Sequence, residues 1–399
     1  MESNNISFNF NFKLQKTETP PYAQPPFAVD KSLQRFDERE AAFYSARFVE
    51  EIMQGEDWRA RQASVATKKM LNAVSGYGQL DYAFAEAAWG SYRPYDGAPL
   101  MRWVEEPGQR RPVEAELKKQ GHLWEGSAPE NSNHLKQAAL YFGATAVGIT
   151  ALNETWFYAT SKEGLPIVFS ADQERPAITV EAKFIPARLN RVIVILVPQD
   201  RELMAFSPSP LAGAAVGLGY SRMAEVASKT AALIRGLGYD AIPMGNDTSL
   251  SVPMAIDAGL GEAGRHGMLL HPRSGSLVRI SKVLTDLPLT VDQPVTFGAA
   301  DFCRSCTICA EHCPAKAISF DRDTTFETAC PSNSRGIKKW PVNSWACLKF
   351  WIYNGRECGI CQAVCPFSRQ RETAEKLEAL PQSIGLKEND PRQWWNNRS

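Results

Sequence analysis

Cysteines are the residues of this chain whose type and spacing point most directly to chemistry. The chain has 399 residues and nine cysteines, all of them between Cys303 and Cys365. The first four follow a C-x2-C-x2-C-x3-C-P pattern, the spacing with which two-cluster iron–sulfur proteins place three thiolates on one [4Fe–4S] cluster and a fourth on the other. A structural zinc site would need its four ligands in two pairs. The pattern therefore predicts two clusters that carry single electrons, with the first ligands at Cys303, Cys306, Cys309 and Cys313.

The second half of the cysteine segment lacks one ligand of that pattern. Cys358, Cys361 and Cys365 keep the expected spacing, but the fourth cysteine that should stand just before Cys358 is missing. The upstream candidates are Cys347 and Cys330. Cys347 is favoured because it lies in a predicted helix that could aim one sulfur inward, which leaves Cys330 as a buried thiol. The crossover rule then predicts one cluster on Cys303, Cys306, Cys309 and Cys365, and the other on Cys313, Cys347, Cys358 and Cys361.

Composition excludes several classes of protein. The 44 Lys and Arg residues balance 44 Asp and Glu residues, so no basic surplus points to nucleic acid. A hydrophobic fraction of 44% is that of an ordinary globular protein and argues against general disorder. The aliphatic runs near 192–197 and 211–220 are far shorter than the roughly 20 residues that span a bilayer. The sequence predicts a globular chain without a membrane-spanning helix.

The elements that must position these cysteines alternate in type. The central sequence predicts a helix ending at Gly143, a strand at 144–152, a doubly covered strand at 191–199 and a helix at 220–238. Strands that alternate with helices favour a layered α/β domain with a mostly parallel sheet. Further expected pieces are a helical segment at 36–71 and strands at 239–244, 268–272 and 276–289.

Four regions follow from this pattern. They are an N-terminal arm with a helical and loop region at 1–130, an α/β core at 131–299, a two-cluster module at 300–368 and a polar tail at 369–399. The first 30 or so residues are polar and rich in proline, which favours an extended arm over a domain.

Two groups of segments together resemble a known family. They are the cysteine segment ACLKFW…GRECGICQAVCPF and the central segments GYDAIPMGND and IDAGLGEAGRHGMLL. The combination resembles the corrinoid-dependent reductive dehalogenases of the respiratory type, which are related to epoxyqueuosine reductase. The resemblance implies a nitroreductase-like α/β (α+β) core that binds cobalamin base-off, followed by a ferredoxin-like module with two [4Fe–4S] clusters.

The corrinoid is implied by the resemblance and not by a ligand motif. The chain lacks the Asp-x-His-x-x-Gly pattern that ligates cobalt elsewhere, and its five histidines lie in no such frame. In the family a Gly-rich turn lies against the corrinoid, which assigns cofactor contacts here to Gly259, Gly261, Gly264 and His266. The turn lacks the frame of a P-loop or a dinucleotide fold, and loop flexibility alone would also explain its glycines.

Three residues match the family's active-site pattern by context and spacing: Tyr220 in GLGYSRM, Asn246 in PMGND and Arg279 in SLVRISK. The resemblance implies that Tyr220 donates a proton to the carbon that loses halide. Arg279 would stabilise the tyrosinate, and Asn246 could orient the substrate without adding charge. Each also has a structural interpretation: Tyr220 as the start of a helix, Asn246 as a turn residue, and Arg279 in a salt bridge at a strand edge.

The implied activity is reductive dehalogenation by Co(I) cobalamin, with electrons from the two clusters. Asn246, where some aryl-type members carry Lys, favours a small chlorinated ethene or alkane. The pocket walls are expected from Trp89, Tyr92, Trp124 and residues 156–158. Two alternatives stay open: an epoxyqueuosine-type tRNA-modifying reductase, which would want a basic surface, and a non-enzymatic iron–sulfur electron carrier.

The expected partners are a small organohalide and an electron donor protein or quinol pathway, with a small membrane-anchor protein as a further candidate and no nucleic acid. Respiratory members are exported by the twin-arginine route. The chain begins without an apolar leader or a twin-arginine pair. Because FAVDKSLQRFD resembles the start of mature respiratory members, the expected location is the outer face of the cytoplasmic membrane with a removed leader. A chain that is complete as given would be cytoplasmic.

Overall fold

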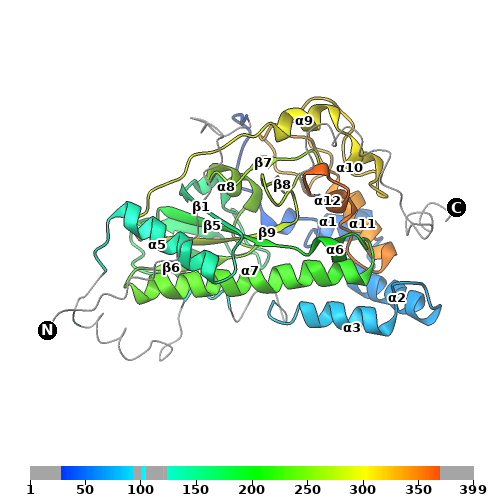
Figure 1. The fold of residues 1–399 in the computed structure, drawn as a ribbon, viewed down its shortest axis with the longest axis horizontal. Coiled ribbons are helices and arrows are strands. Elements are labelled where there is room, and N and C mark those ends of the chain that lie inside the picture. Colours follow the sequence, from blue (N-terminus) through cyan, green and yellow to red (C-terminus); the bar gives the residue numbers. More distant parts are fainter. Residues whose placement is uncertain (1–27, 93–99, 105–119, 121–123, 369–399) are drawn as a thin grey trace.

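A four-stranded sheet forms the centre of the fold (Figure 1). The computed structural model describes residues 28–92, 100–104, 120 and 124–368. The sheet order is β1-β5-β9-β6, and every neighbouring pair is antiparallel. The four strands are β1 (Ala146–Ala151), β5 (Arg191–Pro198), β9 (Val278–Thr285) and β6 (Ala241–Met244).

The prediction of a mostly parallel sheet is therefore wrong, although the strands themselves lie where they were expected. It rested on the alternation of strands with helices and on the apolar run of β5. That run arises because β5 is covered on both faces: its even-numbered residues 192–196 belong to one core cluster and its odd-numbered residues 193–197 to the other. Burial on both faces produces such a run whatever the direction of the neighbouring strands.

Helices α7 (Pro210–Gly236) and α5 (Ala128–Tyr141) cover one face of the sheet, where α7 runs along the strands (Figure 1). The other face packs against α8 (Ser251–Asp257) and a small sheet. The small sheet consists of β2 (Ile167–Ser170), β4 (Lys183–Pro186) and β3 (Ala177–Ile178). Shorter elements are η2 (Glu154–Trp156), α6 (Arg201–Met204), β7 (Glu262–Ala263) and β8 (Leu269–Leu270).

Helix α7 is longer than predicted. The helix expected at 220–238 is only its second half, because α7 begins at Pro210 after the N-cap residue Ser209. Proline is favoured in the first turn of a helix, where its missing N–H is not needed. The Ala- and Gly-rich stretch between Pro210 and Tyr220 thus belongs to the helix and gives it a narrow surface.

The segment predicted as helical at 36–71 is divided into three helices. They are η1 (Glu38–Glu40), α1 (Ala46–Glu51) and α2 (Trp58–Leu71). Asp37, Ser45 and Asp57 each accept a hydrogen bond from a main-chain N–H of the helix that follows. Such capping residues start each helix anew. A further helix, α3 (Gln79–Ala88), packs against α7.

The cysteine module is built from short helices at the end of the described chain, on one side of the sheet (Figure 1). Among them, α11 (Ser344–Asn354) packs against α2 of the N-terminal region. The first described residues pair with this module through a bridge between Val29 and Ile337, whereas nearly all of the predicted arm and the tail at 369–399 lie outside the described residues. The helices are α9 (Ala299–Ser305), α10 (Ile308–Glu311), α11 (Ser344–Asn354), α12 (Ile360–Ala363) and η3 (Pro366–Ser368).

The contact between α3 and α7 depends on Gly217. A Cβ atom at this position would lie 2.4 Å from the indole of Trp89. In an ordinary helix interior Gly→Ala stabilises by up to about 1 kcal/mol. We expect Gly217→Ala instead to lower the free energy of unfolding by about 1–3 kcal/mol because the indole must move. Thermal and urea unfolding measure the change, and a raised melting temperature would contradict this packing.

Candidate functional site

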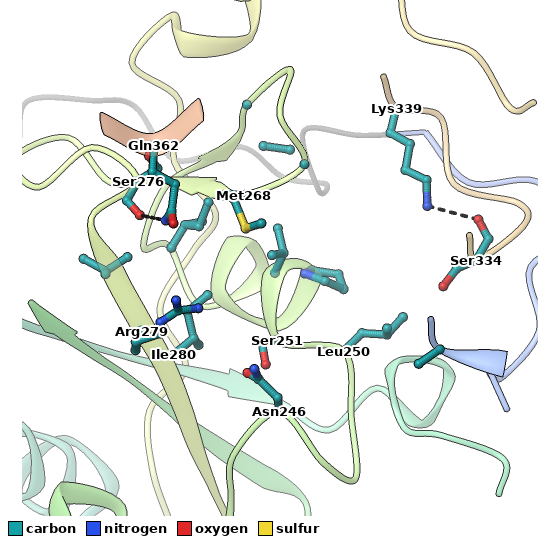
Figure 2. Close-up of a pocket in the computed structure, with 18 of the residues that line it drawn as sticks. Asn246, Leu250, Ser251, Met268, Ser276, Arg279, Ile280, Ser334, Lys339 and Gln362 are labelled. Carbon is teal, nitrogen blue, oxygen red and sulfur yellow. Dashed lines mark hydrogen bonds between the residues drawn. The ribbon is translucent and has the colours of Figure 1, made fainter. Parts of the chain in front are cut away.

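A cavity of about 1050 Å³ is lined by residues of the sheet, α7, the loop after β6 and the cysteine module. This volume is at the upper end of the range for small-molecule pockets. Figure 2 shows Arg279 of β9 and Asn246 of the loop after β6 at this cavity, with Gln362 of α12 above Arg279 and with Ser334 and Lys339 across from them. The cavity thus lies where the core meets the cysteine module.

The three predicted active-site residues come together on the wall of this cavity. Tyr220 lies in α7, Asn246 follows β6 and Arg279 is in β9. The amide Nδ2 of Asn246 donates a hydrogen bond of 2.7 Å to the hydroxyl of Tyr220. The guanidinium carbon of Arg279 lies 4.5 Å from the centre of the Tyr220 ring, and its buried Nε has no hydrogen-bond partner among the described atoms.

Aromatic rings fix the position of the Tyr220 ring. The indole of Trp89 stacks on it with ring centres 4.8 Å apart, and Tyr92 lies at 4.9 Å. Of the residues expected in the pocket walls, Trp89, Tyr92 and Tyr158 line the cavity. The others serve the fold: Trp156 and Phe157 belong to the core, and the indole N–H of Trp124 donates to Asn131.

Sequence reasoning missed the residue that holds the loop of Asn246. Lys282 of β9 is fully buried, and its ammonium donates to the main-chain oxygens of Gly245 and Ser249 and, at 2.9 Å, to the hydroxyl of Ser251. Burial lowers the pKa of Lys282 to about 8. The hydroxyl of Tyr158 also donates to the main-chain oxygen of Asn246 at 3.1 Å. The sequence signal that could have identified Lys282 is a single lysine within a largely apolar strand.

The Gly-rich turn differs in detail from its predicted role. A Cβ atom at Gly259 would lie 2.4 Å from the carbonyl oxygen of Gln293, and one at Gly261 would lie 2.1 Å from that of Leu270. These two glycines therefore allow close approach of the chain's own backbone. Neither of them lines the large cavity, whereas Gly264 does.

His266, the fourth residue assigned to the cofactor, is buried and does not line the cavity either. Its Nδ1 accepts a hydrogen bond from the main-chain N–H of Met268, and its Nε2 has no partner among the described atoms. Burial lowers the pKa of His266 to about 4. The ring is therefore neutral at physiological pH.

The predicted ligand cysteines pack in two apolar clusters of the module. Cys303 and Cys365 belong to one cluster, and Cys309 and Cys313 belong to the other, against which Cys347 and Cys361 pack. Cys309, which is predicted to bind the first [4Fe–4S] cluster, therefore packs with ligands predicted for the second. The ligands predicted for the second are Cys313, Cys347, Cys358 and Cys361.

Burial makes these thiols hard to ionise on their own. It raises the pKa of Cys303 to about 11 and that of Cys347 and Cys365 to about 12. Bound metal deprotonates a coordinating thiol outright and removes this penalty. Among the described residues, no three His, Cys, Asp or Glu side chains form a site for a single metal ion.

Cys330 lies apart from both groups. It packs with Phe48, Trp345 and Leu348, and its sulfur is 3.2 Å from the hydroxyl of Ser344. These neighbours are those of a buried structural thiol.

No helix in the described part of the chain has the length and apolar character that crossing a membrane requires.

Two family models match the chain. The model described as "Reductive dehalogenase subunit" matches residues 166–289, and that described as "4Fe-4S double cluster binding domain" matches residues 302–368. The second match agrees with the cysteine spacing, in which every predicted ligand lies inside the matched range.

Curated relatives share the same core. The chain is 38% identical over 305 residues to a tetrachloroethene reductive dehalogenase of Desulfitobacterium hafniense, covering 70% of this chain and 55% of the relative. It is 37% identical over 255 residues to that of Sulfurospirillum multivorans, covering 60% and 50%. The chain thus spans about half the length of the curated relatives it matches.

A solved catabolic reductive dehalogenase has the same fold, with a TM-score of 0.64 and 25% identity over 92% of this chain and 46% of that chain. A second solved reductive dehalogenase, described in connection with B12-dependent dehalogenation, matches with a TM-score of 0.63 and 25% identity over 94% of this chain and 47% of that chain. The predicted mixed α/β core with a C-terminal two-cluster domain is confirmed. The family predicted from the sequence motifs is confirmed as well: this chain belongs to the reductive dehalogenases.

Proposed function

We propose that the protein removes a halogen from a small organohalide by reduction, in which R–X, two electrons and one proton give R–H and halide. The observation that carries this proposal is the meeting of Tyr220, Asn246 and Arg279 on the wall of one large cavity. Gln362, three residues from Cys365, lines the same cavity. Proton supply and electron supply therefore reach the same space.

Two [4Fe–4S] clusters bring the electrons. The first would be bound by the group that contains Cys303 and Cys365. Ala300 and Asp301 of α9, which closely precede Cys303, line the cavity. The second is bound by the group that contains Cys347, farther along the module. When bound, the two clusters would supply single electrons to the reaction. The ligand sets are Cys303, Cys306, Cys309 and Cys365 for the first cluster, and Cys313, Cys347, Cys358 and Cys361 for the second.

The residues around the cavity fit a corrinoid. The space of about 1050 Å³ is large enough for an extended ring, and Gly264 and Gly267 leave part of its wall without side chains. The buried Nε of Arg279 and the amide of Asn246 offer polar contacts on the same wall. When bound, the corrinoid supplies the low-valent cobalt that breaks the carbon–halogen bond.

The chain itself supplies the proton. Because Asn246 donates to the Tyr220 oxygen, the phenolic proton is not needed for that hydrogen bond and is free to point into the cavity. When the proton leaves, negative charge remains on the ring that faces the Arg279 guanidinium at 4.5 Å. That cation stabilises the phenolate.

The neutral side chain of Asn246 favours a small uncharged substrate, a chlorinated ethene or alkane, over a halophenolate. Similar relatives carry the name tetrachloroethene reductive dehalogenase.

An electron donor protein or quinol pathway supplies the clusters. The place of action is the outer face of the cytoplasmic membrane, and a small membrane-anchor protein is the partner there. Halide release by the anaerobically purified holoprotein with reduced viologen tests the function on chlorinated ethenes, chloroalkanes and halophenols. Full cofactor content with no halide from any of them would contradict it.

Removing the phenolic proton tests the role of Tyr220. Tyr220→Phe keeps the ring between Trp89 and Arg279 but has no proton to donate, so we expect halide release to fall by roughly 10²- to 10⁴-fold. The control is Tyr239→Phe, since the Tyr239 hydroxyl bonds to the oxygen of Trp124 beyond the end of α7. Initial rates at equal cobalamin and iron content measure the effect. Near-normal turnover by Tyr220→Phe would remove this residue as the proton donor.

Two cysteine variants test the displaced ligand. Cys347→Ser should lose the second cluster, so that iron falls from about eight to about four per chain. Cys330→Ser should keep about eight irons because Cys330 packs in a separate apolar cluster. Iron analysis and electron paramagnetic resonance of the reduced protein provide the measurement. Loss of a cluster in Cys330→Ser with full loading of Cys347→Ser would reverse the assignment.

A further inference from the structure

Arg265 joins the Gly-rich turn to the loop of the first two cysteines. Its side chain is 1% exposed. The guanidinium Nε donates to the main-chain oxygens of Cys303 at 3.1 Å and Cys306 at 2.9 Å, and Nη2 donates to that of Cys303 at 2.5 Å. From the other side, Nη1 donates to the main-chain oxygens of Ser319 at 2.9 Å and Asp321 at 2.6 Å. One side chain therefore fixes three separate segments.

The partners of Arg265 are carbonyl groups, which carry no net charge. In the described chain no ion pair joins this guanidinium to a carboxylate. The buried Arg356 differs, because it pairs with Glu86 at 2.8 Å and with Glu357 at 2.9 Å. The acid near Arg265 in sequence, Glu262, instead accepts main-chain hydrogen bonds at the start of α9. Arg265 thus places a positive charge in the interior without a direct ion pair, which is costly.

The first cysteine group lies within reach of that charge. The guanidinium binds the main-chain oxygens of Cys303 and Cys306, two of the residues that would hold the first cluster. A cluster held by four thiolates is negatively charged overall, so it provides the missing counter-charge.

We propose that Arg265 is a positioning residue that fastens the first cluster to the cavity wall and, by its buried charge, raises the reduction potential of that cluster. Reduction adds one electron from the second cluster. A nearby positive charge therefore stabilises the reduced state more than the oxidised one. This inference rests on the cluster binding proposed above and is independent of which organohalide reacts.

The test is a redox titration of the holoprotein followed by electron paramagnetic resonance, without any organohalide. Arg265→Gln removes the charge but can still donate to a carbonyl. We expect the midpoint potential of one cluster to become more negative, while that of the other stays at its wild-type value. Unchanged potentials for both clusters in a variant with full iron content would overturn the proposal.

Arg304→Gln is the matched control. It makes the same change of charge one residue away from Cys303. The side chain of Arg304 is 53% exposed, however, and lies 3.6 Å from Asp323. Water and salt screen such a charge, so both potentials should stay unchanged. A shift equal to that of Arg265→Gln would show that burial of the charge is irrelevant and would also overturn the proposal.

If Arg265→Gln does not fold, Arg265→Lys provides a second test of whether the charge at this position affects the potential of the first cluster. A buried ammonium can lose its proton, whereas a guanidinium stays charged. As the pH rises from about 7 to about 10, the midpoint potential of the first cluster should therefore fall in Arg265→Lys relative to the same potential in wild type. Equal pH dependence in both proteins would contradict the role of the charge. A wild-type protein without cluster signals would instead contradict the cluster binding itself, and these outcomes are distinct from a failure of halide release.

Discussion

The candidate site depends on the close packing of α7 against β9. Helix α7 carries Gly219 where it meets the strand, and a Cβ atom there would lie 3.0 Å from Cγ of Arg279. Gly217 gives the same freedom to the indole of Trp89 on the neighbouring side. The Tyr220 ring is therefore held between a guanidinium and an indole, with its hydroxyl at the amide of Asn246. The packing therefore restricts the orientation of the Tyr220 ring.

A second set of contacts joins the α/β core to the cysteine module. Gly264 lines the cavity, and the next residue, Arg265, binds the carbonyl groups of Cys303 and Cys306. Cavity wall and ligand loop are thus parts of one continuous structure. The loop of Asn246 is held in a similar way by the buried ammonium of Lys282. In both cases a buried cation satisfies main-chain oxygens in irregular segments, which would otherwise be unpaired in the interior.

The motifs predicted the chemistry better than the arrangement of the elements. The cysteine spacing and the contexts of Tyr220 and Asn246 are local patterns, and they pointed to one site before its geometry was known. The antiparallel sheet was missed because a doubly buried strand such as β5 has the same apolar run in either direction. The roles of Lys282 and Arg265 were missed because their partners are carbonyl groups distant in sequence, which no residue pattern reveals. For the same reason, glycines that accommodate backbone, such as Gly261, resembled glycines that accommodate a ligand.

The central claim is that this cavity couples two electrons and one proton to the loss of one halide. The most direct measurement follows tetrachloroethene with the holoprotein and reduced viologen in deuterated buffer, counting chloride, oxidised viologen and deuterium in the product. We expect two viologens oxidised for each chloride released and one deuterium on the carbon that lost it. Chloride release without viologen oxidation, or viologen oxidation without chloride, would contradict the claim.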